Sequence, residues 1–336
     1  MRFNSLIRSV IDNTVVIAQV IKMSTHPQVA VIGECMVELQ KSGELYKQAF
    51  GGDTLNTALY LSRLTQKQGV TTRYITGLGK DPFSQQMLDS WQQEGINTEA
   101  VSISQKHLPG MYLIETSADG ERRFFYWRDN AAAKFWLDEN SKAHTQQLLN
   151  SQQFIYLSGI SLAILPDSAR QLLMEILQQA KQHGAKIVFD NNYRPALWPS
   201  KEAAQQAYQQ ILKLTDIAFL TFDDEQLLYG DCHEIEAISR TQLYGVNEIV
   251  IKRGAEACYV IIDNERYEVP ANKVSHVIDT TAAGDSFSAG YLACRILGGT
   301  PCDAAKTGHL LAGTVIQHRG AIIPAEAMPT TDLGKC

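Results

Sequence analysis

The sequence predicts an α/β protein with a Rossmann-like, mostly parallel central sheet covered by helices and a small antiparallel β-sheet lid. Short apolar runs alternate with segments of helical periodicity from residue 29 onward, an order typical of a parallel sheet. Two segments, 35–50 and 109–128, break the alternation because each contains two consecutive strand-like runs. The 336 residues, 45% hydrophobic and 20% charged, suffice for one large domain.

The expected elements of the central domain are bounded by turn and capping residues. The strands are VAVIG at 29–33, TRYITGLG at 72–79, FIYLSGI at 154–160, AKIVFDNNY at 185–193, DIAFLT at 216–221 and NEIVIKRG at 247–254. The main helices are 53–66, 81–95, 166–184, about 284–297 and 302–318. Asp53 or Thr54 is the expected N-cap of the first helix, and Gly95 and Gly184 end the next two.

The segment 109–128 is expected to form a hairpin that turns at Asp119-Gly120. A two-residue loop would place Tyr112 opposite Trp127, whereas a three-residue loop that begins at Ala118 places it opposite Tyr126. The three-residue loop brings both tyrosines to one face and predicts a positive φ at Gly120. With the two strands of 35–50, the hairpin predicts a lid that excludes water from a reaction.

The ends of the chain are expected to lie outside the domain. Residues 1–28 are interpreted as a loosely attached extension, because the apolar run TVVIAQVI is far shorter than the ~20 residues that span a bilayer. Residues 29–328 are expected to form the folded domain, and residues 329–336 are expected to form a tail. No membrane association is therefore predicted.

Composition narrows the class of function. The net charge of −6 and the absence of any Lys/Arg-rich run argue against nucleic acid as a partner. Six cysteines without a CxxC pair indicate free thiols in a reducing cytoplasm. Three common motifs are absent from the sequence. There is no P-loop, Pro82 stands where a dinucleotide-binding fingerprint needs its third glycine, and Ala163 stands where a nucleophile elbow needs its second glycine.

One stretch, DTTAAGDSFSAGYLACRI at 279–296, indicates chemistry. The small residues Ala282, Ala283 and Gly284 would leave backbone N–H groups free for an anion at the start of a helix. Asp285 follows them, within reach of the same space, and could accept a proton from a hydroxyl. A tight turn that happens to begin a helix explains the small residues equally well, so composition alone leaves both interpretations open.

The sequence resembles the PfkB/ribokinase family of sugar kinases from about residue 29 to 328. The matching segments are VIGECMVEL, FGGDTLNT, LPGMYLIET, FYWRDNAAAKFW, YLSGISLAIL, FDNNYRPALW, DTTAAGDSFSAGYLA and RGAIIPAEAMP. They are most similar to those of the bacterial members that phosphorylate 2-keto-3-deoxygluconate. The resemblance implies a ribokinase-like fold, ATP with Mg²⁺, and a role in the catabolism of hexuronate- and pectin-derived sugar acids.

The resemblance also implies roles for individual residues. Asp285 matches the catalytic base, and Ala282, Ala283 and Gly284 match the anion hole. The family more often has glycine at position 282, so we expect a negative φ there, where a Cβ costs little. The N-x-x-E element linked to Mg²⁺ appears as Thr221-x-x-Asp224, which makes Asp224 the candidate metal residue.

Substrate and nucleotide residues follow from the same matches. The implied sugar contacts are Gly52, Asn56, Tyr112, Tyr126, Arg128, Arg194 and Asp285. The implied ATP contacts are Asn192, Arg194, Thr221, Lys252, Arg253, Gly254, Ala255, Ala257, Cys258, Ala282, Gly284 and His309. Gly52 is expected where backbone approaches the sugar. Phe125 and Trp127 are expected on the opposite lid face from Tyr126, as packing residues.

A sugar acid brings a carboxylate, and arginine's planar fork suits it. Arg128 on the lid and Arg194 on the body are therefore the candidates, although Arg194 could instead bind only ATP phosphate. A kinase of fructose or a nucleoside, and a catalytically silent sugar-binding protein on the same fold, are the alternatives. The lid could also pair across a homo-oligomer.

Overall fold

The computed structural model describes residues 26–116 and 122–333. Most of the expected extension, the Ala118–Gly120 loop with its predicted φ, and Cys336 lie outside these residues, so those expectations stay predictions. The central sheet has eight strands in the order β14-β13-β12-β11-β10-β9-β1-β4. Its strands are β1 (Gln28–Ile32), β4 (Thr71–Ile75), β9 (Phe154–Ser158), β10 (Lys186–Asp190), β11 (Ile217–Thr221), β12 (Glu248–Lys252), β13 (Cys258–Ile262) and β14 (Glu265–Val269).

Pairing is parallel from β4 to β12, as the alternation predicts, and antiparallel at β13 and β14. The sequence did not predict these last two strands. β14 exposes four of its five residues, so it lacks the apolar run that identifies a buried strand. β5 (Gly77–Leu78) and β6 (Ser102–Ile103) form a separate short pair.

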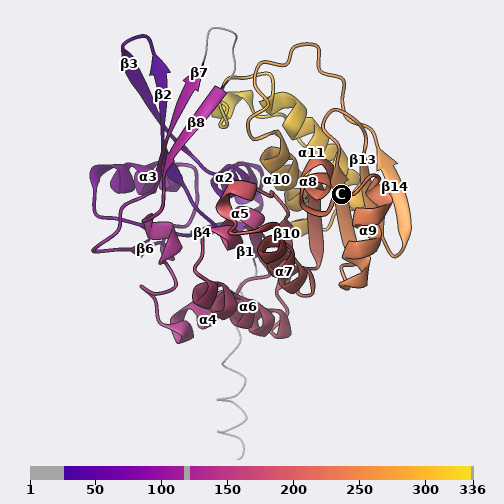
Figure 1. Cartoon of the computed structure of the whole chain (residues 1–336). Coiled ribbons are helices and arrows are strands. Elements are labelled where there is room, and N and C mark those ends of the chain that lie inside the picture. The colour runs from indigo at the N-terminus through magenta and orange to yellow at the C-terminus, as the bar shows by residue number, and fades with distance from the viewer. Residues whose placement is uncertain (1–25, 117–121, 334–336) are drawn as a thin grey trace, which may run out of the picture.

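Helices cover both faces of the sheet, and each face has its own apolar core (Figure 1). One layer contains α2 (Asp53–Thr65), α3 (Pro82–Gln93), α10 (Ala283–Ile296) and α11 (Pro301–Val315). The other contains α4 (Lys142–Asn150), α6 (Asp167–Gln182), α7 (Lys201–Leu212), α8 (Phe222–Tyr229) and α9 (Glu234–Leu243). The short elements are α5 (Gly159–Ala163), η1 (Gln66–Gln68), η2 (Ala132–Lys134), η3 (Pro195–Leu197) and η4 (Ala325–Ala327).

Local capping explains where several helices begin and end. The Asp81 side chain accepts hydrogen bonds from the N–H groups of Phe83 and Ser84, which fixes the start of α3. Gly95 and Gly184 follow the ends of their helices, as predicted, and they adopt the left-handed conformation with φ of 77° and 97°. The predicted N-cap of α2 is wrong: Gly52 occupies that position, and Asp53 is already the first helical residue.

The lid stands apart from the helical layers (Figure 1). It consists of β2 (Met36–Ser42), β3 (Leu45–Gly51), β7 (Met111–Thr116) and β8 (Arg122–Trp127), in the order β3-β2-β7-β8. The two hairpins are antiparallel, and a parallel β2–β7 pair joins them. Tyr112 lies opposite Tyr126, so the predicted register is confirmed.

The outer face of the lid differs from the prediction. Phe125 and Trp127 were expected to pack, but 41% and 60% of their surfaces are exposed. The reason is that this face of β8 has no covering layer in the described chain.

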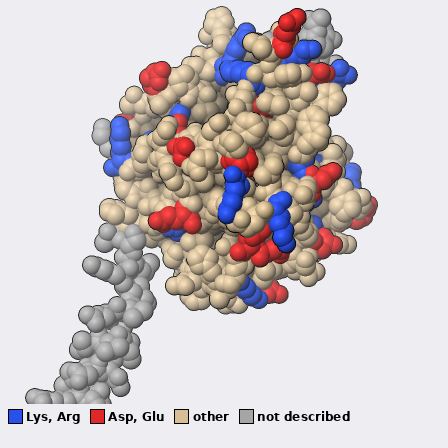
Figure 2. Space-filling view, turned by 90° about the vertical axis from the view of Figure 1, so that its left-hand side faces the viewer, with Lys and Arg blue, Asp and Glu red and all other residues tan. Residues whose placement is uncertain are grey.

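On the lid side of the molecule, acidic and basic side chains are interspersed (Figure 2). In the described residues, no helix is long and apolar enough to cross a membrane.

Candidate active site

Two adjoining cavities lie where the carboxyl ends of the parallel strands meet α10. The lid-side cavity has a volume of about 490 Å³ and is lined by residues of the lid, α2, α10 and the ends of β10 and β11. The second cavity, of about 600 Å³, is lined only by residues 221–316. The two share Thr221, Lys252, Thr280, Ala283 and Gly284. A ligand in one cavity can therefore reach a ligand in the other at the start of α10.

Asp285 projects from the first turn of α10 into the lid-side cavity. Asn56 Nδ2 donates to its Oδ2 at 2.8 Å, which fixes the carboxylate against α2. Burial, together with the nearby charges of Asp53 and Asp190, raises the pKa of Asp285 to about 7. A carboxylate that titrates near neutrality is suited to general-base catalysis.

The loop before α10 brings the predicted small residues together, with one correction. Ala282 has φ 61° and ψ 14°, so the expected negative φ is wrong and the residue adopts a conformation that favours glycine. The reason is the turn: Ala282 is the third residue of the turn that the Ala283 N–H closes on the Thr280 carbonyl, a position at which type II turns need a positive φ. The N–H of Ala283 donates to the Thr280 carbonyl, which leaves the following first-turn N–H groups for an anion.

The segment 317–323 completes the wall of the lid-side cavity. Asp279 accepts hydrogen bonds from the N–H groups of Thr281 and Gly320, which ties this segment to the loop before α10. Tyr60 of α2 donates to the Ala321 carbonyl at 2.6 Å and accepts from the Ile323 N–H. Ala321 itself lines the cavity.

The cleft face of the lid supplies an aromatic wall. Tyr112 and Tyr126 line the cavity as predicted, and Phe124 joins them on the same face. Phe124 could have been found from the strand alternation that placed Tyr126. The Tyr112 hydroxyl donates to the Glu38 carboxylate. A Cβ on Gly51 would lie 2.1 Å from that hydroxyl, so a side chain there would displace Tyr112.

Gly52 lines the cavity as predicted, and the structure adds a second reason for its lack of a side chain. A Cβ on Gly52 would lie 2.2 Å from the carbonyl oxygen of Glu34, so the close approach is to protein backbone. Sequence reasoning could not see this contact, because it joins the strand that enters the lid to the start of α2.

The two candidate arginines have different surroundings. Arg194 lines the lid-side cavity, is half exposed, and lies 3.5 Å from Asp224. Arg128 does not line the cavity; its guanidinium is paired with the buried carboxylate of Glu34. Burial raises the pKa of Glu34, and the charge of Arg128 opposes that rise. The pair joins the two chain segments at the base of the lid.

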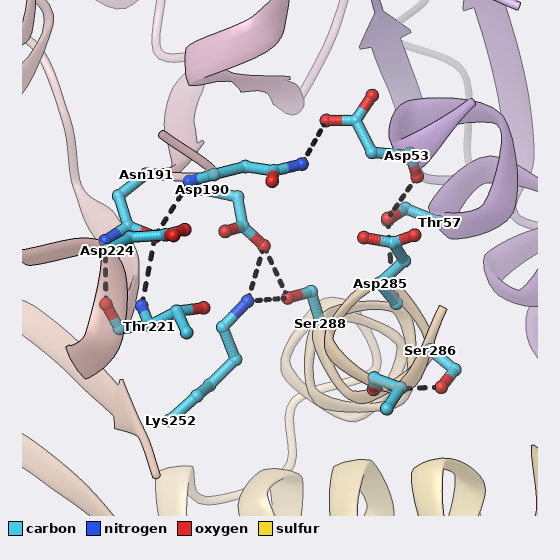
Figure 3. Close-up of polar contacts among 12 residues, drawn as sticks. Asp53, Thr57, Asp190, Asn191, Thr221, Asp224, Lys252, Asp285, Ser286 and Ser288 are labelled. Carbon is cyan, nitrogen blue, oxygen red and sulfur yellow. Dashed lines mark hydrogen bonds and ion pairs between the residues drawn. The ribbon is translucent and has the colours of Figure 1, made fainter. Parts of the chain in front are cut away.

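Asn192 lies at the lid-side cavity, between β10 and α2. Its φ of 27° is unusual for asparagine, and its Nδ2 donates to Asp53 at 2.6 Å. The buried Asn191, which sequence reasoning missed, holds this geometry: its Oδ1 accepts from the N–H groups of Asn192 and Thr221. Asn191 thereby joins the ends of β10 and β11 (Figure 3).

The second cavity contains most of the residues that the sequence predicts to contact ATP. Among the predicted ATP residues, Thr221, Lys252, Arg253, Gly254, Ala255, Cys258, Gly284 and His309 line it, whereas Asn192, Arg194 and Ala282 line the lid-side cavity. Ala257 lines neither, and its carbonyl accepts from Arg253 Nε. Val274, Val277 and Ile316 add an apolar wall that sequence reasoning missed. His309 Nε2 contacts the Val269 carbonyl, and burial lowers its pKa.

The site fits a Mg²⁺ ion that is held mainly by phosphates. In the described part of the chain, no group of three His, Cys, Asp or Glu side chains could hold a metal alone. Asp224 lines the lid-side cavity, and one of its oxygens has only the long contact to Arg194. A single carboxylate combined with substrate phosphates and water is a common way to bind Mg²⁺.

Comparisons with known proteins agree with this geometry. The profile described as "pfkB family carbohydrate kinase" matches residues 26–328. The chain is 54% identical to a 2-dehydro-3-deoxygluconokinase of Escherichia coli K12 over 90% of this chain and 99% of the relative. It is 53% identical to one of Dickeya dadantii 3937, over 91% and 99%.

A solved structure shows the same fold. The structure of a putative ribokinase II from Escherichia coli, in complex with ATP and Mg²⁺, superposes with a TM-score of 0.75 at 24% identity. The superposition covers 90% of this chain and 96% of that one. The predicted ribokinase-like fold is therefore confirmed. From the family profile and the close relatives together, the chain belongs to the pfkB family of carbohydrate kinases.

Proposed function

We propose that the protein transfers the terminal phosphoryl group of ATP to the 6-hydroxyl of 2-keto-3-deoxy-D-gluconate, also called 2-dehydro-3-deoxygluconate. The observation that carries the proposal is the 54% identity to a 2-dehydro-3-deoxygluconokinase over 99% of that relative. The two cavities support it, because they meet beside Asp285 and could hold a sugar acid and a nucleotide end to end.

The reaction follows from the arrangement at the start of α10. The sugar hydroxyl lies against Asp285, and its oxygen forms a bond to the terminal phosphorus while the bond from that phosphorus to the ADP oxygen breaks. The hydroxyl proton passes to Asp285, and ADP leaves with the electron pair. The first-turn N–H groups and the helix dipole stabilise the charge on the phosphoryl oxygens.

Mg²⁺, when bound with ATP, neutralises phosphate charge and orients the nucleotide. We assign Asp224 to its coordination, directly or through water. In the sugar cavity, we assign Asn56 to orienting Asp285, and Tyr112 and Tyr126 to the sugar face. The acid's carboxylate would meet Arg194 on the body or Arg128 at the base of the lid.

Measurement of ADP release over a panel of sugars tests the proposal. We expect 2-keto-3-deoxygluconate to give the highest kcat/KM, above fructose, nucleosides and gluconate. A higher kcat/KM for fructose or a nucleoside would assign the protein to another substrate of the same fold. If no sugar stimulates ADP release while nucleotide and sugar acid both bind, the protein is a catalytically silent binder.

We also propose that the enzyme works in the cytoplasm as a homo-oligomer. The exposed aromatic outer face of the lid, with Phe125 and Trp127, supports pairing with a second copy. Trp127→Glu is expected to lower the molar mass in sedimentation equilibrium, and an unchanged mass would reject the lid as the interface. Fractionation of cells that express the protein tests the compartment.

A further inference from the structure

Lys252 ends β12 at the wall common to the two cavities. Its Nζ lies 2.8 Å from Asp190 Oδ2 and 3.4 Å from Ser288 Oγ (Figure 3). The ion pair is buried, with 10% of the lysine side chain and 4% of the aspartate side chain exposed. A charge so placed faces both ligands and little solvent.

The lysine points toward the start of α10. A Cβ built on Gly284 would lie 3.5 Å from Lys252 Nζ, and Gly284 immediately precedes Asp285. The ammonium group therefore faces the same space as the first-turn N–H groups. A phosphoryl group that passes from one cavity to the other must cross this space.

Several contacts fix the lysine in place. Asp190 Oδ2 also accepts from Ser288 Oγ at 2.9 Å and from the Tyr156 hydroxyl at 3.2 Å. With Lys252, these partners come from β9, β12 and α10, so the carboxylate at the end of β10 is restrained from three sides. Stability does not explain the arrangement, because replacement of a buried ion pair by apolar residues is often neutral or stabilising.

We propose that Lys252 is a catalytic residue that contacts the phosphoryl group in transit, and that Asp190 and Ser288 are its positioning residues. This inference rests on the proposed phosphoryl transfer. In this step the hydroxyl proton goes to Asp285, and the ammonium group of Lys252 binds the non-bridging oxygens while the phosphorus changes partners. Removal of one such preorganised donor commonly lowers kcat by about 10²–10³.

The test compares Lys252→Met with the double variant Lys252→Met/Asp190→Asn, after the wild type has been shown to phosphorylate its sugar. Without wild-type turnover the proposed function fails, which is a separate outcome. We expect Lys252→Met to lose about 100-fold or more in kcat, with the Kd of ADP changed by less than about threefold, since ADP lacks the transferred group. Lys252→Met leaves the charge of Asp190 buried without its partner, so its melting temperature should fall. The double variant removes both charges, so it should have a melting temperature close to that of the wild type but should not regain kcat.

Matched controls separate positioning from structure. Lys181→Met breaks another lysine–aspartate pair, with Asp216, and should leave kcat unchanged. Ser288→Ala should lower kcat by about tenfold at constant sugar KM. The charge of Lys252 lowers the pKa of Asp285. If Ser288→Ala releases the lysine from its place, the acid limb of the kcat/KM profile should therefore move to higher pH. Lys252→Arg keeps the charge and should restore part of kcat.

Two results would overturn the proposal. Recovery of near wild-type kcat in the double variant would show that Lys252 only neutralises Asp190. A loss of ADP affinity as large as the loss of kcat would make Lys252 a general nucleotide ligand.

Discussion

The two cavities are built in opposite ways, although they share one wall. The lid-side cavity draws residues from the lid, α2, the strand ends and the segment near 320, and it contains Asp53, Asp190, Asp223, Asp224 and Asp285. The second cavity comes from residues 221–316 alone and is lined largely by small and apolar side chains. In the proposed function we therefore assign sugar choice and proton transfer to the lid-side cavity, and nucleotide binding to the second cavity.

The largest effect is expected at Asp285, where a substitution should lower kcat without changing the affinity for the nucleotide. Asp285→Asn should lower kcat by about 10²–10⁴, or roughly 3–5 kcal/mol of barrier, while the Kd of ADP stays the same. Single-turnover kinetics and calorimetric titration measure the two quantities. A variant that keeps more than about a tenth of wild-type kcat would remove Asp285 from the role of base.

The pH dependence sharpens the same comparison. Because burial raises the pKa of Asp285 to about 7, kcat/KM for the sugar should fall about tenfold per unit as pH drops below that value. A folded-state pKa above the unfolded value means that stability is lost as pH rises through it, so the buried charge destabilises the enzyme at alkaline pH. Above that pH, Asp285→Asn should therefore have a free energy of unfolding about 1 kcal/mol or more above that of the wild type, and a higher melting temperature. A flat rate profile across the range would contradict the assignment.

The lid side should determine which sugar is accepted. Arg128→Leu should lower kcat/KM for 2-keto-3-deoxygluconate, by an amount that corresponds to roughly 1.5–3 kcal/mol of activation free energy. The KM of ATP should change little. Because Glu34 would then be buried without its partner, Glu34→Gln/Arg128→Leu serves as the folded control. If both variants keep the wild-type kcat/KM, the carboxylate of the substrate binds elsewhere, and Arg194 becomes the candidate.

A substitution in the second cavity should change the KM of ATP and leave the KM of the sugar nearly unchanged. Ala312 lines the apolar wall of the second cavity, so Ala312→Leu should raise the KM of ATP by about tenfold through overpacking. The KM of the sugar should stay within about twofold, since Ala312 does not line the lid-side cavity. An equal rise in both KM values would show that the cavities are not independent.

The smallest expected effect concerns the shared wall. Ala282 holds a left-handed conformation that costs alanine about 1 kcal/mol, so Ala282→Gly should raise the melting temperature slightly. Ala283→Gly, one residue later at the start of α10, should lower the melting temperature, because glycine in a helix costs about 0.5–1 kcal/mol relative to alanine. Thermal denaturation of the two variants checks the difference in sign, and a decrease in both would contradict the strain.

Local patterns predicted much of this molecule. Alternating apolar runs placed the parallel strands, and capping residues placed α3 and α6. Strand alternation, together with the expectation that Tyr112 and Tyr126 share one face, gave the register that puts them opposite each other. Asp285 was predicted because small residues, a carboxylate and a helix start are adjacent in sequence. Each of these signals involves neighbours along the chain.

Features that depend on distant segments were not predicted. Arg128 and Glu34 are 94 residues apart, and nothing local indicates that they pair. The left-handed Ala282 and the buried Asn191 depend on how strand ends meet the loop before α10. β14 was missed because its exposed, charged residues look like a loop until β13 pairs with it.

The contacts of Tyr60 with Ala321 and Ile323 have a consequence for the order of folding during synthesis. Strands β1 to β12, the lid and Asp285 all leave the ribosome before residue 321, yet the sugar cavity lacks part of its wall until Ala321 docks on α2. A chain that stops shortly before that point lacks the Ala321 part of the wall of the lid-side cavity, whereas all lining residues of the second cavity are already present. Docking of Ala321 on α2 is therefore a late step in the assembly of this cavity, because Ala321 follows every other lining residue in the sequence.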